Sequence, residues 1–79
     1  MSEMEAFEMQ RMFTRLALVA SDSKSVDGIS YETGMDKLVL KTHLDEMVAF
    51  GEAVYYTDGN SINHYSLVNG KEGREGYGD

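Results

Sequence analysis

Apolar residues recur along the first twenty positions with the spacing of an α-helix. Ser2 and Glu5 stand at the spacing of a capping box, so a helix is expected over about residues 3–20. The positions expected to face the core are Ala6, Met9, Phe13, Leu16 and Ala20. One long helix that packs through this stripe is therefore predicted at the start of the chain.

Two shorter helices are predicted after a polar break. Ser25 can cap a helix over about residues 26–33, and Gly34 can end it in the left-handed conformation. Asp36 can cap a third helix of about fourteen residues, which Gly51 closes. The positions expected to face inward are Val26 and Ile29 in the second helix and Leu40, Leu44, Met47 and Val48 in the third.

A β-hairpin is predicted beyond the third helix. Residues 53–57 and 62–68 are rich in β-branched and aromatic side chains, and Asp58-Gly59 between them is a strong turn signal. An isolated two-stranded ribbon is not stable in water, so the hairpin must pack on the helices. The side chains expected to make this contact are Val54, Tyr65 and Leu67.

This order of elements predicts one mainly α domain over residues 1–69, with three helices followed by a two-stranded hairpin. The last ten residues, 70–79, contain four glycines and five charged side chains, with almost nothing to bury. They are expected to form a disordered, Gly-rich charged tail.

Several features coincide in the segment SVDGISYETGMDKLVLKTHLDEMVAFGEAVYY, which is followed by DGNSINHYSLV. They are a capped short helix, a Gly-Met turn, a recognition-type helix with Leu40 and Leu44 four apart, a Phe-Gly terminus and a hairpin that ends in Tyr-Ser-Leu. Together they resemble the winged helix-turn-helix superfamily of small transcriptional regulators, over about residues 5–69. The resemblance implies that the hairpin is the wing. The alternative is an unrelated three-helix domain with a terminal hairpin.

The resemblance also implies a nucleic-acid-binding surface. In this superfamily the second helix of the motif lies in the major groove of double-stranded DNA. Carried onto this chain, the contact residues are Lys37, Leu38, Lys41 and Thr42 of the third helix, with Tyr56, Asn60 and Ser61 of the wing. The lysines would meet phosphate or guanine, Thr42 a base edge and Leu38 a thymine methyl group, while the wing residues offer neutral hydrogen bonds to phosphate.

Charge keeps a second function open. Fourteen acidic against seven basic side chains give a net charge of −7, the wrong sign for a general polyanion binder. The wing has no lysine or arginine between Tyr55 and His64 and instead holds Asp58. The chain is therefore either a DNA-binding transcriptional regulator or an acidic winged-helix module that binds a protein partner in transcription or replication.

No other chemistry is indicated by the residue types present. The absence of cysteine excludes disulfides and thiolate metal sites and favours a reducing compartment. His43 and His64 are isolated in the sequence and are expected on the surface, so no metal or cofactor is expected. The sequence has no recognisable nucleophile motif, so no enzyme activity is expected either. The N-terminus lacks the positive region of a signal peptide and the longest apolar run, residues 16–20, is too short to span a bilayer, so a cytoplasmic protein is expected.

The first helix carries apolar groups on a second face as well. Opposite the expected inward stripe, at roughly heptad spacing, lie Met4, Phe7, Arg11, Thr14 and Leu18, of which Thr14 is not assigned to the interface. The other four are expected to form the interface of a homodimer that places two recognition helices in successive grooves. The alternative is that Phe7 packs on the tail or the hairpin and Leu18 stays exposed.

Overall fold

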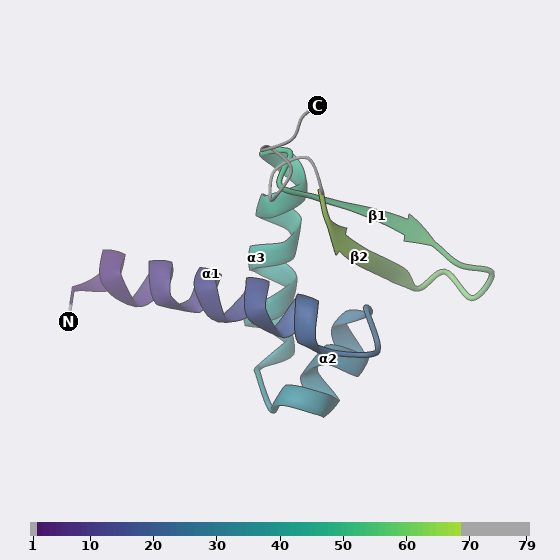
Figure 1. Cartoon of the computed structure of the whole chain (residues 1–79), viewed down its shortest axis with the longest axis horizontal. Helices are drawn as coiled ribbons and strands as arrows, with labels where there is room; N and C mark the ends of the chain where they lie inside the picture. The colour runs from purple at the N-terminus through teal and green to yellow at the C-terminus, as the bar shows by residue number, and fades with distance from the viewer. Residues whose placement is uncertain (1, 69–79) are drawn as a thin grey trace.

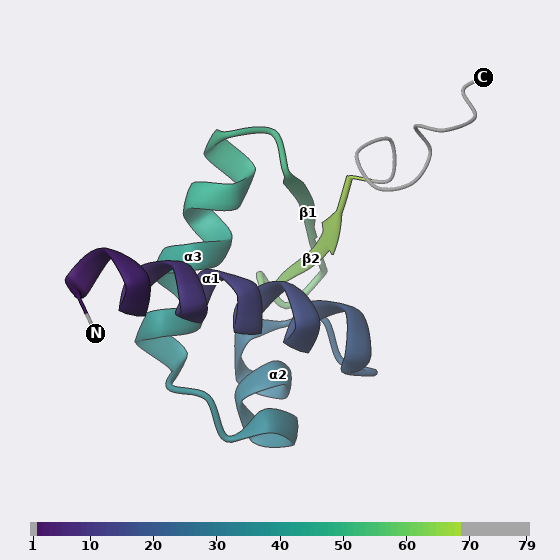
Figure 2. The same ribbon diagram turned by 60° about the vertical axis from the view of Figure 1, so that its left-hand side comes forward.

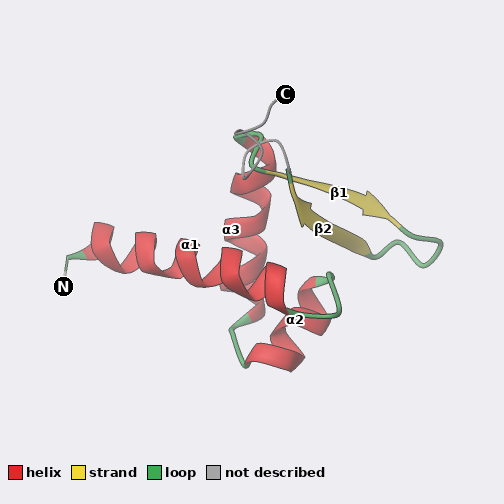
Figure 3. Ribbon diagram, in the orientation of Figure 1, coloured by secondary structure: helices red, strands yellow, loops and turns green. Residues whose placement is uncertain are grey.

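Three helices come first along the chain and a two-stranded antiparallel hairpin follows them (Figure 1). The computed structural model describes residues 2–68. The elements, coloured by type in Figure 3, are α1 (Glu3–Ala20), α2 (Val26–Thr33), α3 (Lys37–Ala49), β1 (Ala53–Thr57) and β2 (Asn63–Leu67). The predicted fold class, mainly α with the winged helix-turn-helix order of elements, is confirmed. The predicted domain end at residue 69 and the tail over 70–79 lie outside the described residues.

Local capping interactions start and end the helices where the sequence predicts. The Ser2 hydroxyl accepts a hydrogen bond from the backbone N–H of Glu5 at 3.1 Å, and the Glu5 carboxylate accepts from the N–H of Ser2 at 2.9 Å. Ser25 and Asp36 cap α2 and α3 by accepting from backbone N–H groups of the first turn. Gly34, at a φ of 80°, ends α2 in the left-handed conformation.

One buried cluster joins all the elements. In Figures 1 and 2, α1 lies across α3, α2 lies below this crossing, and the hairpin lies to the right of α3, next to the C-terminal end of α1. The buried apolar side chains are Ala17, Leu18, Ile29, Leu40, Leu44, Met47, Ala53 and Tyr65. The inward positions predicted for α2 and α3 are confirmed, because Val26 and Val48 also pack against this cluster.

The buried face of α1 is opposite to the one predicted. The expected core positions are exposed, namely Ala6, Met9, Phe13, Leu16 and Ala20. In their place Thr14, Ala17 and Leu18 are buried. The Thr14 hydroxyl donates to the carbonyl of Gln10 at 2.8 Å, so this polar group is buried with its hydrogen bond made. The predicted stripe is wrong because α1 carries apolar residues on both faces at helical spacing, and the periodicity does not distinguish which face packs inward.

The hairpin covers the helices with one face. Tyr65 is 2% exposed and Leu67 packs against the core, as predicted. Val54 is instead 52% exposed, because it falls on the outer face of β1, and Ala53 takes its expected place in the core. The backbone N–H of Tyr65 donates to the carbonyl of Lys24 at 2.9 Å. This bond ties β2 to the connection between α1 and α2.

The turn between the strands lies where Asp58-Gly59 predicts, but it is longer than a two-residue turn. The N–H of Asp58 donates to the carbonyl of Ile62 at 2.9 Å, and the Asp58 carboxylate accepts from the N–H groups of Asn60 and Ile62 at 2.7 and 3.1 Å. The left-handed residue is Ser61, at a φ of 66°, and not Gly59. The carboxylate of Asp58 therefore organises a loop over residues 58–62.

The start of α2 lies very close to the connection that precedes it. A Cβ atom added at Gly28 would stand 1.8 Å from the Ser23 hydroxyl oxygen and 2.3 Å from the Ser23 Cβ. Position 28 thus needs glycine because of a close approach, and not because of its backbone angles.

We expect Leu44→Ala to lower the free energy of unfolding by about 2–5 kcal/mol, because a fully buried leucine loses both its transfer energy and its packing. Leu44 is 0% exposed in the centre of the cluster. Urea unfolding followed by circular dichroism measures the loss. The matched control is Leu38→Ala on the same helix, where the side chain is 74% exposed. Equal losses in the two variants would show that the inward face of α3 is assigned wrongly.

Candidate nucleic-acid interface

The outer face of α3 is open to solvent. Leu38 and Thr42 lie on the side of the helix opposite the buried Leu40 and Leu44, and Lys37 and Lys41 lie at its flank. All four predicted contact residues are exposed. Leu38 stands out because a leucine that is 74% exposed contributes nothing to the core. The structure therefore brings these four side chains together on one surface, which we call the α3 surface.

Both lysines of the α3 surface are held by carboxylates. Lys37 Nζ lies 3.2 Å from Asp27 Oδ1 of α2, and Lys41 Nζ lies 2.7 Å from Asp45 Oδ2 one turn along α3. The hydrogen bond to Asp45 raises the pKa of Lys41, so the lysine stays charged. A phosphate that binds either lysine must therefore displace or neighbour a carboxylate.

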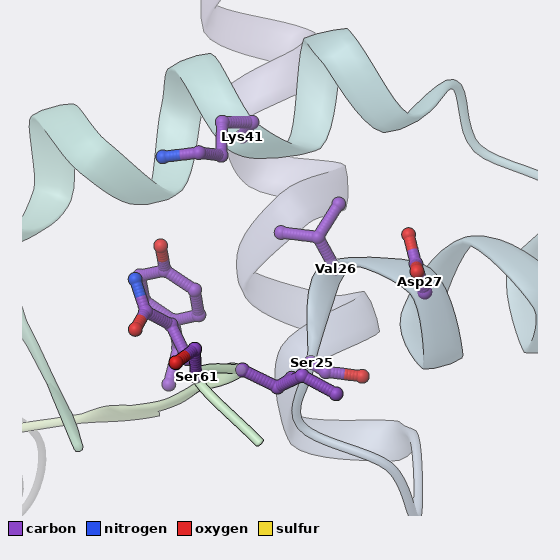
Figure 4. A pocket seen from close by; sticks show the side chains of 8 residues that line it. Ser25, Val26, Asp27, Lys41 and Ser61 are labelled. Atoms are coloured by element: carbon purple, nitrogen blue, oxygen red, sulfur yellow. The ribbon is translucent and has the colours of Figure 1, made fainter. Parts of the chain in front are cut away.

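A hollow of about 330 Å³ separates the α3 surface from the hairpin. Figure 4 shows Lys41 above it, Ser61 of the hairpin loop below it and Val26 and Asp27 of α2 at its side. Ser25, Ile62, Asn63 and Tyr65 complete its lining. The hydroxyl of Tyr65 donates to Asp45 Oδ1 at 3.2 Å, so the lysine, the carboxylate and the hairpin are connected in one chain of contacts.

The predicted wing residues do not all lie on this side. Ser61 lines the hollow together with Lys41, whereas Asn60 is exposed in the loop and is not part of the lining. Tyr56 lies on the other face of the ribbon, where its ring stacks on His64 with centroids 4.9 Å apart. The structure thus separates Tyr56 from the α3 surface and brings Asn63 and Tyr65 to the hollow in its place.

The hairpin loop has its own acidic centre. His64 Nε2 lies 2.8 Å from Asp58 Oδ2, and this bond, with the backbone N–H groups of Ile62 and Asn60, lowers the pKa of Asp58. The loop therefore presents a carboxylate where a wing that grips phosphate needs a cation.

Sequence reasoning missed the carboxylates that pair with the α3 surface. The i, i+4 spacing of Lys41 and Asp45 is a readable signal for an ion pair within one helix. The partner of Lys37 is Asp27, on another helix, and no local pattern connects the two residues.

A polar cluster joins α1 to α3 beside the core. Arg11 Nε donates to His43 Nδ1 at 2.7 Å, and the Arg11 guanidinium also pairs with Glu46. Gln10 Oε1 lies 3.3 Å from His43 Nε2, and the ring of Phe7 lies 4.7 Å from the imidazole between centroids. His43 is 1% exposed, so its predicted place on the surface is wrong. Burial and then the charge of Arg11 lower the pKa of His43, against the opposite effect of Glu46.

This cluster also corrects the predicted dimer face. Leu18 is 1% exposed and Arg11 bonds within its own chain, so neither is available to a second copy. Phe7 is 40% exposed but turns its ring toward His43, and Met4 is 66% exposed. The face expected to be intermolecular is therefore the intramolecular one, because α3 already covers most of it.

Residues 2–68 contain neither a metal-binding cluster nor a membrane-spanning helix. No three His, Asp or Glu side chains of this range converge on a point that could hold a metal ion. None of its helices combines the length and the apolar character that crossing a bilayer requires.

Comparison with solved structures supports the fold. A proposed DNA-binding protein from Ralstonia eutropha JMP134 superposes with a TM-score of 0.53 at 21% sequence identity, over 81% of this chain and 82% of that one. At this identity the match shows a shared fold. No family model matches the chain, and no curated protein does.

We expect the free energy of unfolding to fall as the pH drops below about 6.5, the ordinary pKa of histidine. The pKa of His43 is lowered in the folded state, so the unfolded chain takes up a proton first and is favoured as acid is added. Stability from this residue is present above pH 6.5 and is lost below it. Urea unfolding at pH 7.5 and 5.5 measures the difference.

The matched variant is His43→Gln, which keeps hydrogen-bonding capacity toward Arg11 but cannot titrate. The difference between the two pH values should be smaller in this variant than in the wild type. If both proteins lose the same free energy, the carboxylates and not His43 cause the pH dependence.

Proposed function

We propose that this chain binds double-stranded DNA and that α3 enters the major groove. The observation that carries the proposal is the α3 surface: two lysines, a threonine and an exposed leucine on the helix that the winged helix-turn-helix arrangement presents outward. The description of the Ralstonia eutropha protein as a proposed DNA-binding protein supports the same function. Fold alone does not decide function, so the proposal depends on the side chains of this surface.

Each residue of the α3 surface has a chemical role in this proposal. Lys37 and Lys41 contact phosphate or the acceptor atoms of guanine, because ammonium groups donate hydrogen bonds to both. Thr42 bonds a base edge, and Leu38 contacts a thymine methyl group, which explains an exposed leucine at this position. Ser61, across the hollow from Lys41, adds a neutral contact to phosphate.

The ion pairs of the α3 surface make its affinity for DNA depend on the base sequence. Asp27 and Asp45 partly cancel the charge that attracts phosphate, so nonspecific affinity is low. Affinity must then come from base contacts, as in a sequence-specific transcriptional regulator. We propose that such a regulator acts without catalysis and as a homodimer, because two copies double the few phosphate contacts and read two half-sites.

The second candidate is an acidic module that binds a protein partner. The ion pairs of both lysines favour this function, because the α3 surface then offers an exposed apolar side chain, Leu38, next to two neutralised lysines. The two functions differ in one measurement, since only the first gives a complex with duplex DNA whose affinity depends on α3.

We expect Lys41→Gln to weaken binding to a selected DNA duplex by about 5- to 150-fold, or about 1–3 kcal/mol, if Lys41 reads a base. The matched control is Lys71→Gln, which removes a cation of the same kind outside α3 and the hairpin. Fluorescence anisotropy over a series of salt concentrations measures both, and about two phosphate contacts per subunit should give a shallow slope near −2. Equal losses in the two variants would indicate diffuse charge attraction, and a slope of about −8 per monomer would contradict the proposed surface.

We expect Asp45→Asn to strengthen DNA binding several-fold, because it releases Lys41 from its ion pair and removes a negative charge beside the groove. Asparagine keeps an oxygen that accepts the hydrogen bond of Tyr65. The control is Glu72→Gln, which changes the net charge by the same amount outside α3 and the hairpin. If both variants bind more tightly to the same degree, net charge and not the α3 surface determines affinity.

A further inference from the structure

We infer that the exposed apolar face of α1 is the interface of a homodimer in which the two α1 helices run antiparallel. The face consists of Met9, Met12, Phe13, Leu16 and Val19, whose exposed fractions are 37%, 48%, 48%, 60% and 64%. Their spacing of three or four residues puts them on one side of the helix, opposite the buried Thr14 and Leu18. A helix with apolar stripes on two sides is covered on two sides in the assembled protein.

The size of the face fits a second copy. At these exposed fractions the five side chains present roughly 500 Å² of apolar surface, as large as the patches that mark functional contacts on monomers. Two such faces bury about 1,000 Å² together, the lower bound for a specific interface, before the flanking side chains are counted. An 18-residue helix is about 27 Å long, so two α1 helices can lie side by side along the full stripe.

No other element within residues 2–68 covers this face, because all five of its side chains are exposed there. Residues 70–79 contain glycines, charged residues and one aromatic, Tyr77, and no aliphatic side chain. The hairpin and α2 already pack on the other side of α1. A second copy supplies an apolar stripe of the same length and composition, which is the property of an isologous interface.

Charge selects the antiparallel orientation. On α1 the carboxylates Glu3, Glu5 and Glu8 occupy the N-terminal half, and the cation Arg15 lies in the C-terminal half. Glu8 borders the apolar face beside Met9 and Met12, and Arg15 keeps 43% of its side chain exposed. Antiparallel helices set Glu8 near Arg15 of the second copy, whereas parallel helices set like charges side by side.

Sedimentation equilibrium tests the interface. Wild type should sediment at twice the monomer mass of 8.8 kDa at micromolar concentration. Leu16→Glu should raise the dimer dissociation constant at least about 100-fold, because two carboxylates would be buried in the seam without partners. Val19→Glu should act in the same direction, and circular dichroism must show the wild-type helix content in both variants. The matched control Leu38→Glu places the same charge on the α3 surface and should remain dimeric.

Two outcomes overturn the inference. If the wild type stays monomeric at high micromolar concentration, the proposed homodimer does not form. If Leu16→Glu and Val19→Glu both stay dimeric, the dimer interface is not this face of α1. The test is separate from DNA binding: a Leu38→Glu protein that dimerises but does not bind DNA supports both proposals. A dimeric wild type without DNA affinity leaves the interface standing and refutes the proposed function.

Cysteine cross-linking tests the orientation, since the chain contains no cysteine of its own. Phe13→Cys lies near the middle of the stripe, so in an antiparallel pair the two thiols meet and oxidise to a disulfide-linked dimer. Val19→Cys lies about 9 Å further along the helix than Phe13, so in an antiparallel pair its two copies stand about 18 Å apart along the helix axis. This distance is too large for a disulfide. Efficient cross-linking at both positions would overturn the antiparallel arrangement and indicate parallel helices.

Discussion

The packing of α1 across α3 is the contact on which the other elements depend. An eight-residue α2 and a two-stranded hairpin are both too short to be stable by themselves. Each inserts into the cluster that this crossing creates, α2 with Ile29 and the hairpin with Ala53 and Tyr65. At the edge of the cluster, Arg11 and His43 set the rotation of α1 by a directional hydrogen bond, which apolar contacts do not supply. The orientation of the α3 surface follows from this crossing.

The electrostatic character of the domain comes from pairing more than from net charge. Within residues 2–68 the four cations Arg11, Arg15, Lys37 and Lys41 each have a carboxylate partner, and Lys24 donates to the carbonyl of Leu18 at 2.7 Å. The exposed pairs of Arg15, Lys37 and Lys41 add little stability. In the proposed DNA-binding function their larger effect is on recognition, because the pairs of Lys37 and Lys41 keep the α3 surface nearly neutral until a ligand offers better partners to the lysines. A DNA-binding surface with this property has low affinity for nonspecific DNA.

The elements of this fold were readable from the sequence because their boundaries are local. Ser2 with Glu5, Asp36 and Gly34 act within one turn of the helix they start or end, and the backbone follows them closely. The face of α1 was not readable, because apolar residues follow both sides of this helix and only its packing on the other elements selects the buried side. The residues of the α3 surface were proposed from the family resemblance and are exposed as expected. The pairing of Lys37 with Asp27 was not foreseen, since that partner comes from another helix. The position of Tyr56 was predicted wrongly because side chains alternate between the two faces of a strand. Ala53 enters the core, so Tyr56, three residues later, lies on the opposite face of the hairpin.

Gly28 shows how close packing limits what can be changed in this domain. Replacing a helical glycine by alanine is a common way to make a protein more heat-resistant, since the unfolded chain becomes less free. Here the added methyl group would fall on Ser23, inside normal contact distance. The apparent weak point of α2 is the place where two segments touch, and protein engineering of the helix must begin at its outward positions, such as Tyr31, which is 91% exposed.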